Sequence, residues 1–386
     1  MPNIEQSVEK LRSAFHERNL TLYLGAGVSI GSNLPSWEKL VLAMYFSKIS
    51  QEKLGGWRPF SNYLYSIAEW QLENTTEPLE ITARKLRRFY SPENEYSFIE
   101  DLYLSLYGNF LYEGHPLPDI NSQMVRYYNA TLDAVAKLCE SEGRGVRAVI
   151  TYNYDSLLEI ALDNFPHQTI FNSTQLIPSA LPIYHVHGYV PLNRQIASSK
   201  GDEIVFTEDQ YHQVAESPYY WSNLVQLQLM SNSVGLMIGL SLSDRNMRRI
   251  LDAIRNSPIN STNFALLKAP DTTSPEEEVF DKIHHKAIEY LNMLENSGIK
   301  SEQRGSESVF SYMPGMKSDQ PVVIGGVATA GIKGGPRYRF QIAGIIEQVK
   351  LVEEELQKFV LDELGITPIW YQDYSDIPGI LGGILK

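Results

Sequence analysis

The side chains best suited to chemistry in this sequence lie in four short polar motifs, which are Gly25–Ser29, Thr151–Asp155, His185–Gly188 and Gly239–Asn246. Glycines let a backbone approach a phosphate closely, and exposed amides supply partial positive charge. Asparagine and aspartate offer donors and acceptors, and histidine transfers protons near neutral pH. Together these groups could bind a phosphorylated ligand and move a proton.

The glycine motif reads Gly25-Ala26-Gly27-Val28-Ser29. It is not a full G-x-G-x-x-G and lacks the Walker lysine, which argues against a Rossmann dehydrogenase or a P-loop ATPase. Two glycines alone are equally compatible with a plain strand-to-helix turn.

The second motif contains Asn153 and Asp155. The carboxamide of Asn153 can donate and accept, whereas the carboxylate of Asp155 only accepts. The alternative interpretation is a turn in which Asp155 or Ser156 caps the following helix.

The third motif places His185 and His187 on the same face of an expected strand, with His187 at the strand end, where a general base would be needed. The alternative is a pair of structural histidines, and a metal pair lacks a carboxylate or cysteine close by in sequence. The small polar residues of the fourth motif could contact ribose or phosphate. Here the alternative is helix capping by Ser243 or Asp244.

Each of the four motifs directly follows a predicted buried strand. The strands are expected at residues 20–24, 146–151, 183–186, 234–238 and, without a motif, 264–268. Strands that alternate with helices favour a parallel α/β sheet. Ligands of such sheets bind outside the carboxyl ends of the strands, at the switch in strand order. The four motifs are therefore expected to converge on one crevice.

The predicted fold is α/β, with a Rossmann-like parallel sheet, a large helical insertion and a C-terminal helical or mixed extension. The domain that contains this sheet would cover residues 1–270, with the insertion at about 51–143, although a separate helical domain is also compatible with that stretch. In the extension, residues 275–386, we expect long helices near 276–296 and 340–364, a polar loop at 297–320, and a glycine-rich piece at 325–335. The apolar seam of the second long helix could join subunits or pack within its own chain.

Composition narrows the class of protein. The formal net charge of -13 disfavours nucleic-acid binding, and no apolar run approaches the roughly 20 residues that span a bilayer. The N-terminal segment is polar and does not resemble a signal peptide. We therefore expect a cytoplasmic protein. Its one cysteine, Cys139, cannot form an internal disulfide or a four-cysteine zinc site, so no zinc is expected.

The motifs occur in the order in which sirtuins carry them, and the chain resembles the sirtuin-like branch of bacterial anti-phage defence over roughly residues 20–254. The resemblance rests on the glycine turn, Pro35 with Trp37, Thr151-x-Asn153-x-Asp155, His187-Gly188 and Gly239-x-Ser241, and on the segment Glu203–Tyr211. It implies that NAD+ is the substrate. The diphosphate would be held by the turn residues Gly25, Ala26, Gly27 and Ser29. Asn153 and Asp155 would face the nicotinamide and its ribose, His187 would act on ribose hydroxyls or water, and Ser241 and Asn246 would lie on the adenosine side.

The chain departs from deacetylating sirtuins, because one cysteine excludes their four-cysteine zinc module and the helical insertion replaces the usual early loop. We therefore expect an NAD+ hydrolase that cleaves the nicotinamide–ribose bond. The alternatives are an NAD-dependent protein deacylase or ADP-ribosyltransferase, and a non-catalytic NAD+ or ADP-ribose sensor. The resemblance also implies a partner, such as a hexameric HerA-type ATPase or a short Argonaute, and the C-terminal extension could form a homo-oligomer.

Overall fold

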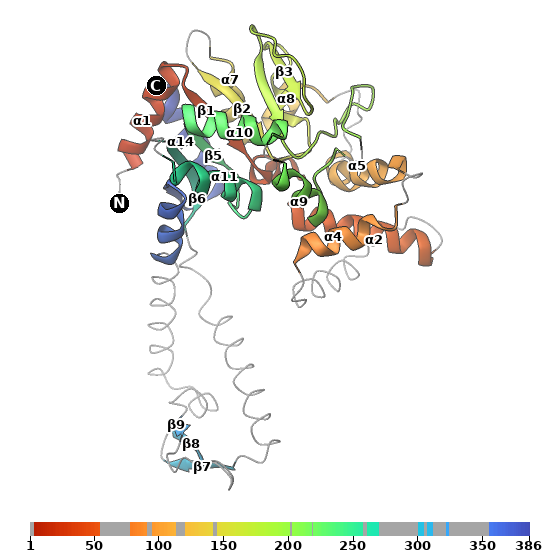
Figure 1. Ribbon diagram of the computed structural model, residues 1–386, viewed down its shortest axis with the longest axis vertical. Coiled ribbons are helices and arrows are strands. Elements are labelled where there is room, and N and C mark those ends of the chain that lie inside the picture. The colour runs from red at the N-terminus through yellow and green to blue at the C-terminus, as the bar shows by residue number, and fades with distance from the viewer. Residues whose placement is uncertain are drawn as a thin grey trace. The chain divides into compact units, whose positions relative to one another are not determined.

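A seven-stranded parallel sheet is the frame of the protein in the computed structural model (Figure 1). The structure describes residues 4–54, 78–90, 95–112, 120–141, 145–200, 203–217, 219–257, 261–269, 300–304, 307–311, 322–323 and 355–386. No described helix is both long and apolar enough to cross a membrane.

The strand order of the sheet is β10-β6-β5-β1-β2-β4-β3, and every neighbouring pair is parallel. The strands are β1 (Leu20–Leu24), β2 (Val146–Thr151), β3 (His167–Ile170), β4 (Leu181–His185), β5 (Val234–Ile238), β6 (Thr262–Lys268) and β10 (Ile366–Tyr371). The chain builds β2 to β4 on one side of β1 and then crosses to β5 on the other side. The switch in strand order therefore lies at β1, which confirms the predicted Rossmann-like α/β class.

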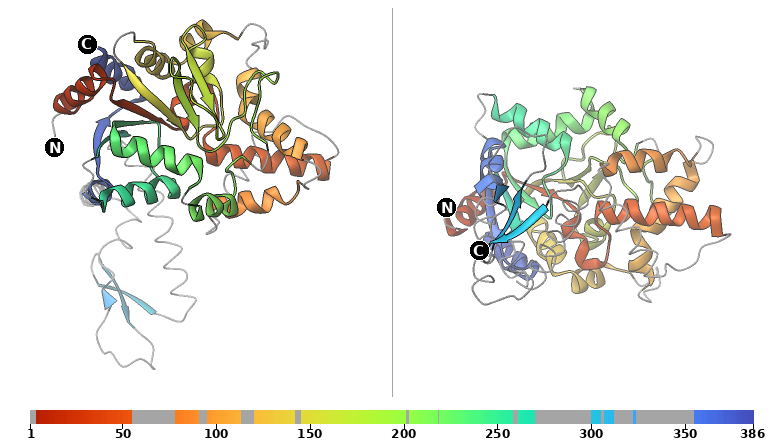
Figure 2. Two further views of the ribbon diagram at one scale, coloured as in Figure 1. Left: turned by 45° about the horizontal axis from the view of Figure 1, so that its top comes forward. Right: turned by 90° about the horizontal axis from the view of Figure 1, so that it is seen from below.

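Helices cover both faces of the sheet, as the two views of Figure 2 show. Side chains alternate along β1, so that Leu22 and Leu24 point to one face while Tyr23 points to the other. The first face packs on α1 (Ile4–His16), α7 (Ala130–Cys139), α8 (Leu157–Ala161) and α14 (Ile377–Leu385). The second face packs on α10 (Trp221–Asn232) and α11 (Arg245–Arg255). The two apolar clusters make a three-layer domain.

The predicted insertion is helical throughout its described residues. Between residues 51 and 143 the described chain forms the end of α2 (Trp37–Leu54), then α4 (Leu79–Arg87), α5 (Glu95–Tyr112), α6 (Ser122–Tyr128) and α7. Helix α2 packs on α4 and α5, and α4 packs on α9 (Glu208–Glu216), away from the end of the sheet that carries α1 and α14 (Figure 1). Helices α4 and α5 therefore group with α2 beside the sheet, whereas α7 belongs to the helical layer on its first face.

The C-terminal part differs from the expected division. One compact unit comprises residues 1–268 and 360–386, and a second comprises residues 269–359. Residues 360–386, which we had assigned to the extension, belong to the first unit, because β10 pairs with β6 and α14 packs on α1 and α7. Their apolar side chains Ile369, Ile377, Leu381 and Ile384 are buried in the core.

The polar stretch 297–320 was predicted to be a loop, and this prediction was wrong for its described residues. Strands β7 (Lys300–Arg304) and β8 (Glu307–Ser311) pair antiparallel, and β9 (Val322–Val323) adds to β8. Strand β8 contains Val309 and Phe310, and β-branched and aromatic residues favour strands. The long helix near 276–296, the glycine-rich piece and most of the 340–364 seam lie outside the described residues.

Gly25, Gly27 and Gly239 let the turns after β1 and β5 touch. The amide of Gly27 donates to the carbonyl of Gly239, and a side-chain carbon at Gly27 would lie 2.6 Å from the Gly239 Cα. Gly239 itself has a φ of +67°, which favours glycine. A methyl group cannot enter this contact without moving one backbone away from the other. The close approach at the switch point therefore depends on glycine.

We expect Gly27→Ala to lower the free energy of unfolding by about 1–3 kcal/mol, the usual effect of overpacking a tight site. Denaturant unfolding of the purified variant measures it. Gly379→Ala is the matched control, because nothing lies within 4 Å of a side-chain carbon at this helical position. The control should be neutral or slightly stabilising. Equal stability of the two variants would contradict the prediction.

Candidate active site

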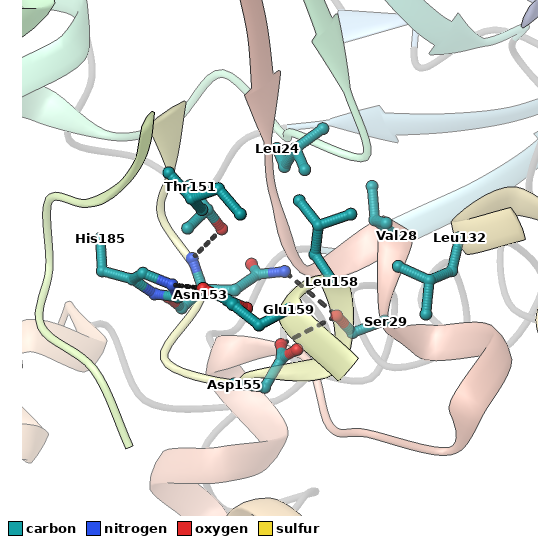
Figure 3. A pocket seen from close by; sticks show the side chains of 11 residues that line it. Leu24, Val28, Ser29, Leu132, Thr151, Asn153, Asp155, Leu158, Glu159 and His185 are labelled. Carbon is teal, nitrogen blue, oxygen red and sulfur yellow. Dashed lines mark hydrogen bonds and ion pairs between the residues drawn. The ribbon is translucent and has the colours of Figure 1, made fainter. Parts of the chain in front are cut away.

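Two of the predicted motifs, Gly25–Ser29 and Thr151–Asp155, join in one hydrogen-bond network at the carboxyl end of β1 and β2 (Figure 3). The Asn153 Nδ2 donates to the Gly25 carbonyl at 3.0 Å and to the Ser29 Oγ at 3.2 Å. The Ser29 hydroxyl in turn donates to the Asp155 Oδ2 at 2.8 Å. The glycine turn, the asparagine and the aspartate thus lie together, as the sequence predicts.

The orientation of the Asn153 carboxamide follows from these contacts. Both donors of the Nδ2 are used by Gly25 and Ser29, and no donor of a described residue reaches the Oδ1. The backbone is held as well, because the Asn153 N–H donates to the Thr151 Oγ1 at 3.1 Å. The Asn153 Oδ1 is therefore a preorganised acceptor without a partner among the described residues.

Asp155 is buried and accepts two hydrogen bonds, from Ser29 and from the Leu157 N–H at 3.0 Å. Burial raises the pKa of its carboxyl above the usual range, although the two hydrogen bonds and the nearby His185 act in the opposite direction. The contact with Leu157 lies at the start of α8, so the helix-capping interpretation applies to Asp155, and its role in binding stays a prediction.

The raised pKa of Asp155 predicts how stability depends on pH. The unfolded chain loses the proton first as pH rises, so the folded state must then ionise a buried carboxyl, and the stability falls until pH exceeds the raised pKa. Asp155→Asn removes this ionisation. We expect the unfolding free energy of the variant, relative to the parent protein, to increase between pH 4 and pH 8. Urea unfolding across that range measures it, and a pH-independent difference would contradict the assignment.

His187 belongs to a second network at the same edge of the sheet. Its Nε2 lies 3.2 Å from the Asp244 Oδ2, and both side chains are buried. The imidazole ring lies between the rings of Tyr152 and Tyr211, with centroids 5.1 and 5.4 Å away and both edge-on. The contact with Asp244 lacks the alignment of a hydrogen bond and acts through charge when His187 is protonated.

Asp244 is the electrostatic partner that fixes this histidine. Burial alone would raise the pKa of the Asp244 carboxyl, but the charge of His187 and the hydrogen bond from the Met247 N–H lower the pKa below its usual value. The same carboxylate caps α11, since its Oδ1 accepts from the Met247 N–H at 2.7 Å. The capping interpretation is therefore correct for Asp244 but describes only half of its contacts.

We predicted that His185 and His187 lie on the same face of a strand, and this prediction was wrong. Strand β4 ends at His185, so the period of two does not extend to His187. The His185 ring contacts Glu159 of α8 with 2.6 Å between Nε2 and Oε1, whereas His187 faces Asp244. Each histidine therefore has its own carboxylate, drawn from a distant part of the chain.

The other predicted ligand residues lie around these networks. Pro35 precedes α2, and the Trp37 ring packs edge-on against Phe206 with centroids 6.4 Å apart. Ser241 is exposed after β5, with its Oγ 2.6 Å from the Ser243 Oγ. Their roles in binding stay predictions.

Asn246 is held inside the helical layer. It is buried, its Nδ2 donates to the Asn223 Oδ1 of α10 at 2.8 Å, and its Oδ1 accepts from Arg249. These contacts join α10 to α11. The structure thus shows a packing role, and a ligand contact for Asn246 stays a prediction.

Sequence reasoning missed two carboxylates, Glu159 and Asp244, as partners of the histidines. Each lies at a helix start, where acidic residues commonly face solvent or cap the backbone. One usable signal was the presence of a glutamate in the apolar first turn after Asp155, where it falls on the buried side of α8.

A small cavity lies behind Asn153. It is lined on its polar side by Ser29, Thr151, Asn153, Asp155, Glu159 and His185, and its volume of about 10 Å³ is roughly that of one water molecule (Figure 3). Within the described part of the chain, no group of three or more His, Cys, Asp or Glu residues could hold a metal ion.

The comparisons with known proteins agree with this geometry. A family model described as "SIR2-like domain" matches residues 147–290, which include Asn153, Asp155, His187 and Asp244. No curated protein matches the chain. SIR2-like domains use NAD+. The parallel sheet, the glycine turn at its switch point and this match together support a sirtuin-like family for the chain.

Proposed function

We propose that the protein is an NAD+ glycohydrolase, which converts NAD+ and water into nicotinamide, ADP-ribose and a proton. The single observation that carries the proposal is the network in which Asn153 bonds the glycine turn and Ser29, and Ser29 bonds Asp155. It gathers an acceptor oxygen and a buried carboxylate beside the turn at the switch point, where sheets of this class bind nucleotides.

Cleavage of the nicotinamide–ribose bond does not require a strong acid. The leaving nicotinamide departs as a neutral molecule from a cationic ring, so the bond breaks through an oxocarbenium-like state without protonation of the leaving group. The protein must orient the ribose, stabilise positive charge and deliver water. Asp155 supplies a carboxylate for the nicotinamide amide, and the Asn153 Oδ1 supplies an acceptor for water or a ribose hydroxyl.

The base is His187. With its Nε2 directed at Asp244, the Nδ1 is the nitrogen that accepts a proton from water or from a ribose hydroxyl. The imidazolium formed in that step gains the attraction of the Asp244 carboxylate, whose pKa is already low. The flanking tyrosine rings restrict the orientation of the imidazole.

The direct test is incubation of the full chain with NAD+, followed by chromatographic identification of products. We expect nicotinamide and ADP-ribose in equal amounts, with no acceleration by an acetylated peptide. Tight NAD+ binding without nicotinamide release over hours would favour a sensor. Peptide-dependent NAD+ loss would favour a deacylase or an ADP-ribosyltransferase. A candidate ATPase partner is added in a parallel arm, because an NAD+ hydrolase that harms its host requires an inactive ground state.

The biological setting that we propose is anti-phage defence by NAD+ depletion, with a HerA-type ATPase or similar protein as partner. This part rests on the resemblance of the five ordered motifs to defence sirtuins. Its test is the NAD+ content of infected cells that carry the protein, compared with cells that carry Asn153→Ala. A fall in NAD+ in the first culture alone is the expected result.

A further inference from the structure

A buried histidine–glutamate pair stands directly behind Asn153. His185 of β4 is 1% exposed and Glu159 of α8 is 8% exposed, and the His185 Nε2 lies 2.6 Å from the Glu159 Oε1. Charged side chains are rarely buried to this extent unless they are paired. None of the chemistry assigned above uses either residue.

The other nitrogen of His185 contacts the backbone of Asn153. Its Nδ1 lies 3.1 Å from the Asn153 carbonyl oxygen. A carbonyl oxygen only accepts, so the Nδ1 must carry a hydrogen. The Nε2 then faces the glutamate either as an imidazolium beside a carboxylate or as a neutral imidazole beside a carboxylic acid. In both states the ring keeps its hydrogen bond to Asn153.

Neighbouring elements hold the pair in place. The Thr169 hydroxyl of β3 lies 3.4 Å from the Glu159 Oε1, and the Tyr189 ring lies 4.6 Å from the His185 ring. Phe171 stacks on the Tyr189 ring in turn. The imidazole therefore has little freedom to rotate away from the Asn153 carbonyl.

The pair also borders the water-sized cavity. The Glu159 Oε2 is buried and has no hydrogen-bond partner among the described residues, and Glu159, His185 and Asn153 all line that cavity (Figure 3). A water molecule there would satisfy the carboxyl oxygen. The pair thus adjoins both the backbone of Asn153 and a small polar chamber.

We propose that His185 and Glu159 are positioning residues for Asn153. Glu159 fixes the His185 ring, and the His185 Nδ1–H fixes the Asn153 peptide, so the carboxamide keeps the orientation that it shows with Gly25 and Ser29. The consequence for turnover rests on the proposed NAD+ hydrolysis. The consequence for the geometry of Asn153 does not.

Two substitutions separate the two contacts of His185. The amide nitrogen of His185→Asn falls near the place of the Nδ1 and keeps a donor for the Asn153 carbonyl. It loses the contact with the Glu159 carboxyl. The amide nitrogen of His185→Gln falls near the place of the Nε2 and keeps a donor for Glu159. It loses the hydrogen bond to the Asn153 carbonyl. Neither variant removes a residue that touches the substrate.

The first experiment compares kcat, KM and the melting temperature of these variants. We expect His185→Gln to lower kcat by up to about 10²-fold, the loss that a displacement of about 1 Å can cause, with little change in KM. His185→Asn should retain most of the turnover yet melt at a lower temperature than His185→Gln, because Glu159 is left buried and unpaired. If the variant with the lower melting temperature also has the lower kcat, the proposal is overturned.

The second experiment reads the geometry without activity. In protein labelled with ¹⁵N-asparagine, the side-chain amide signal of Asn153 is assigned by its disappearance in Asn153→Ala. We expect His185→Gln to shift this signal and His185→Asn to leave it close to its original position. An unmoved signal in His185→Gln would overturn the positioning role. A parent protein that releases no nicotinamide would instead overturn the proposed function, while this measurement would still decide the role of His185.

Discussion

Replacement of His187 by alanine is expected to lower the rate of nicotinamide release by about 10²–10⁴-fold, the usual contribution of a general base. The structure holds the ring between two tyrosines and directs its Nε2 at Asp244, 3.2 Å away. Alanine removes both the basic nitrogen and the group whose positive charge Asp244 stabilises. The measurement is free nicotinamide from purified variant and parent protein at saturating NAD+.

The loss must be separated from damage to the fold. His187→Gln keeps a donor near the place of the Nε2 for Asp244 but cannot take up a proton, so it should be as slow as the alanine variant while melting closer to the parent protein. His212→Ala is the control for the substitution itself, because that histidine is exposed on α9. Near-normal turnover in His187→Gln would remove the histidine from the chemistry.

The parts of the fold that could be predicted are those in which the sequence alone determines burial. The bounds of β1, β2 and β5 agree with the expected ranges, because each is a run of apolar residues buried on both faces of a parallel sheet. Strand β3 was missed, since its four residues at the edge of the sheet are mostly half-buried and carry no apolar run. Strand β10 contains Pro368, which is typical of an edge strand and weakened the signal.

The candidate site likewise contains contacts that could be predicted from the sequence and contacts that could not. The meeting of Asn153, Asp155 and the glycine turn was predictable, because parallel strands bring their carboxyl ends to one edge. The carboxylates that complete the histidines were not, because their contacts depend on how α8 and α11 pack on the sheet. Glu159 contacts His185 of β4, which lies 26 positions away in sequence. Residue spacing carries no information about such a contact until the topology is known.

Asn153→Ala is expected to reduce nicotinamide release by about 10²–10³-fold, comparable with the loss of one preorganised hydrogen-bonding group at an active centre. The substitution deletes the acceptor oxygen and both donors of the carboxamide. Ser29 then keeps its bond to Asp155 but loses the donor from the asparagine. We expect the change in kcat rather than KM, because the proposed mechanism assigns Asn153 to the reacting ribose or water and not to the remainder of the dinucleotide.

Asn153→Asp separates the contribution of the Asn153 Oδ1, an acceptor, from that of the two Nδ2 donors. Aspartate retains an oxygen in place of the Oδ1, but its second oxygen faces the Gly25 carbonyl, an acceptor, and adds negative charge near Asp155. If the acceptor alone mattered, this variant would keep its turnover. If the orientation set by the glycine turn matters, it should be as slow as alanine and less stable at neutral pH than at pH 5, because two carboxyls then compete for one buried region. Asn232→Ala, which changes an exposed asparagine at the end of α10, should match the parent protein in both measurements. Full turnover in both Asn153 variants would remove Asn153 from the chemistry and would leave its contacts with Gly25 and Ser29 as a structural feature of the switch point.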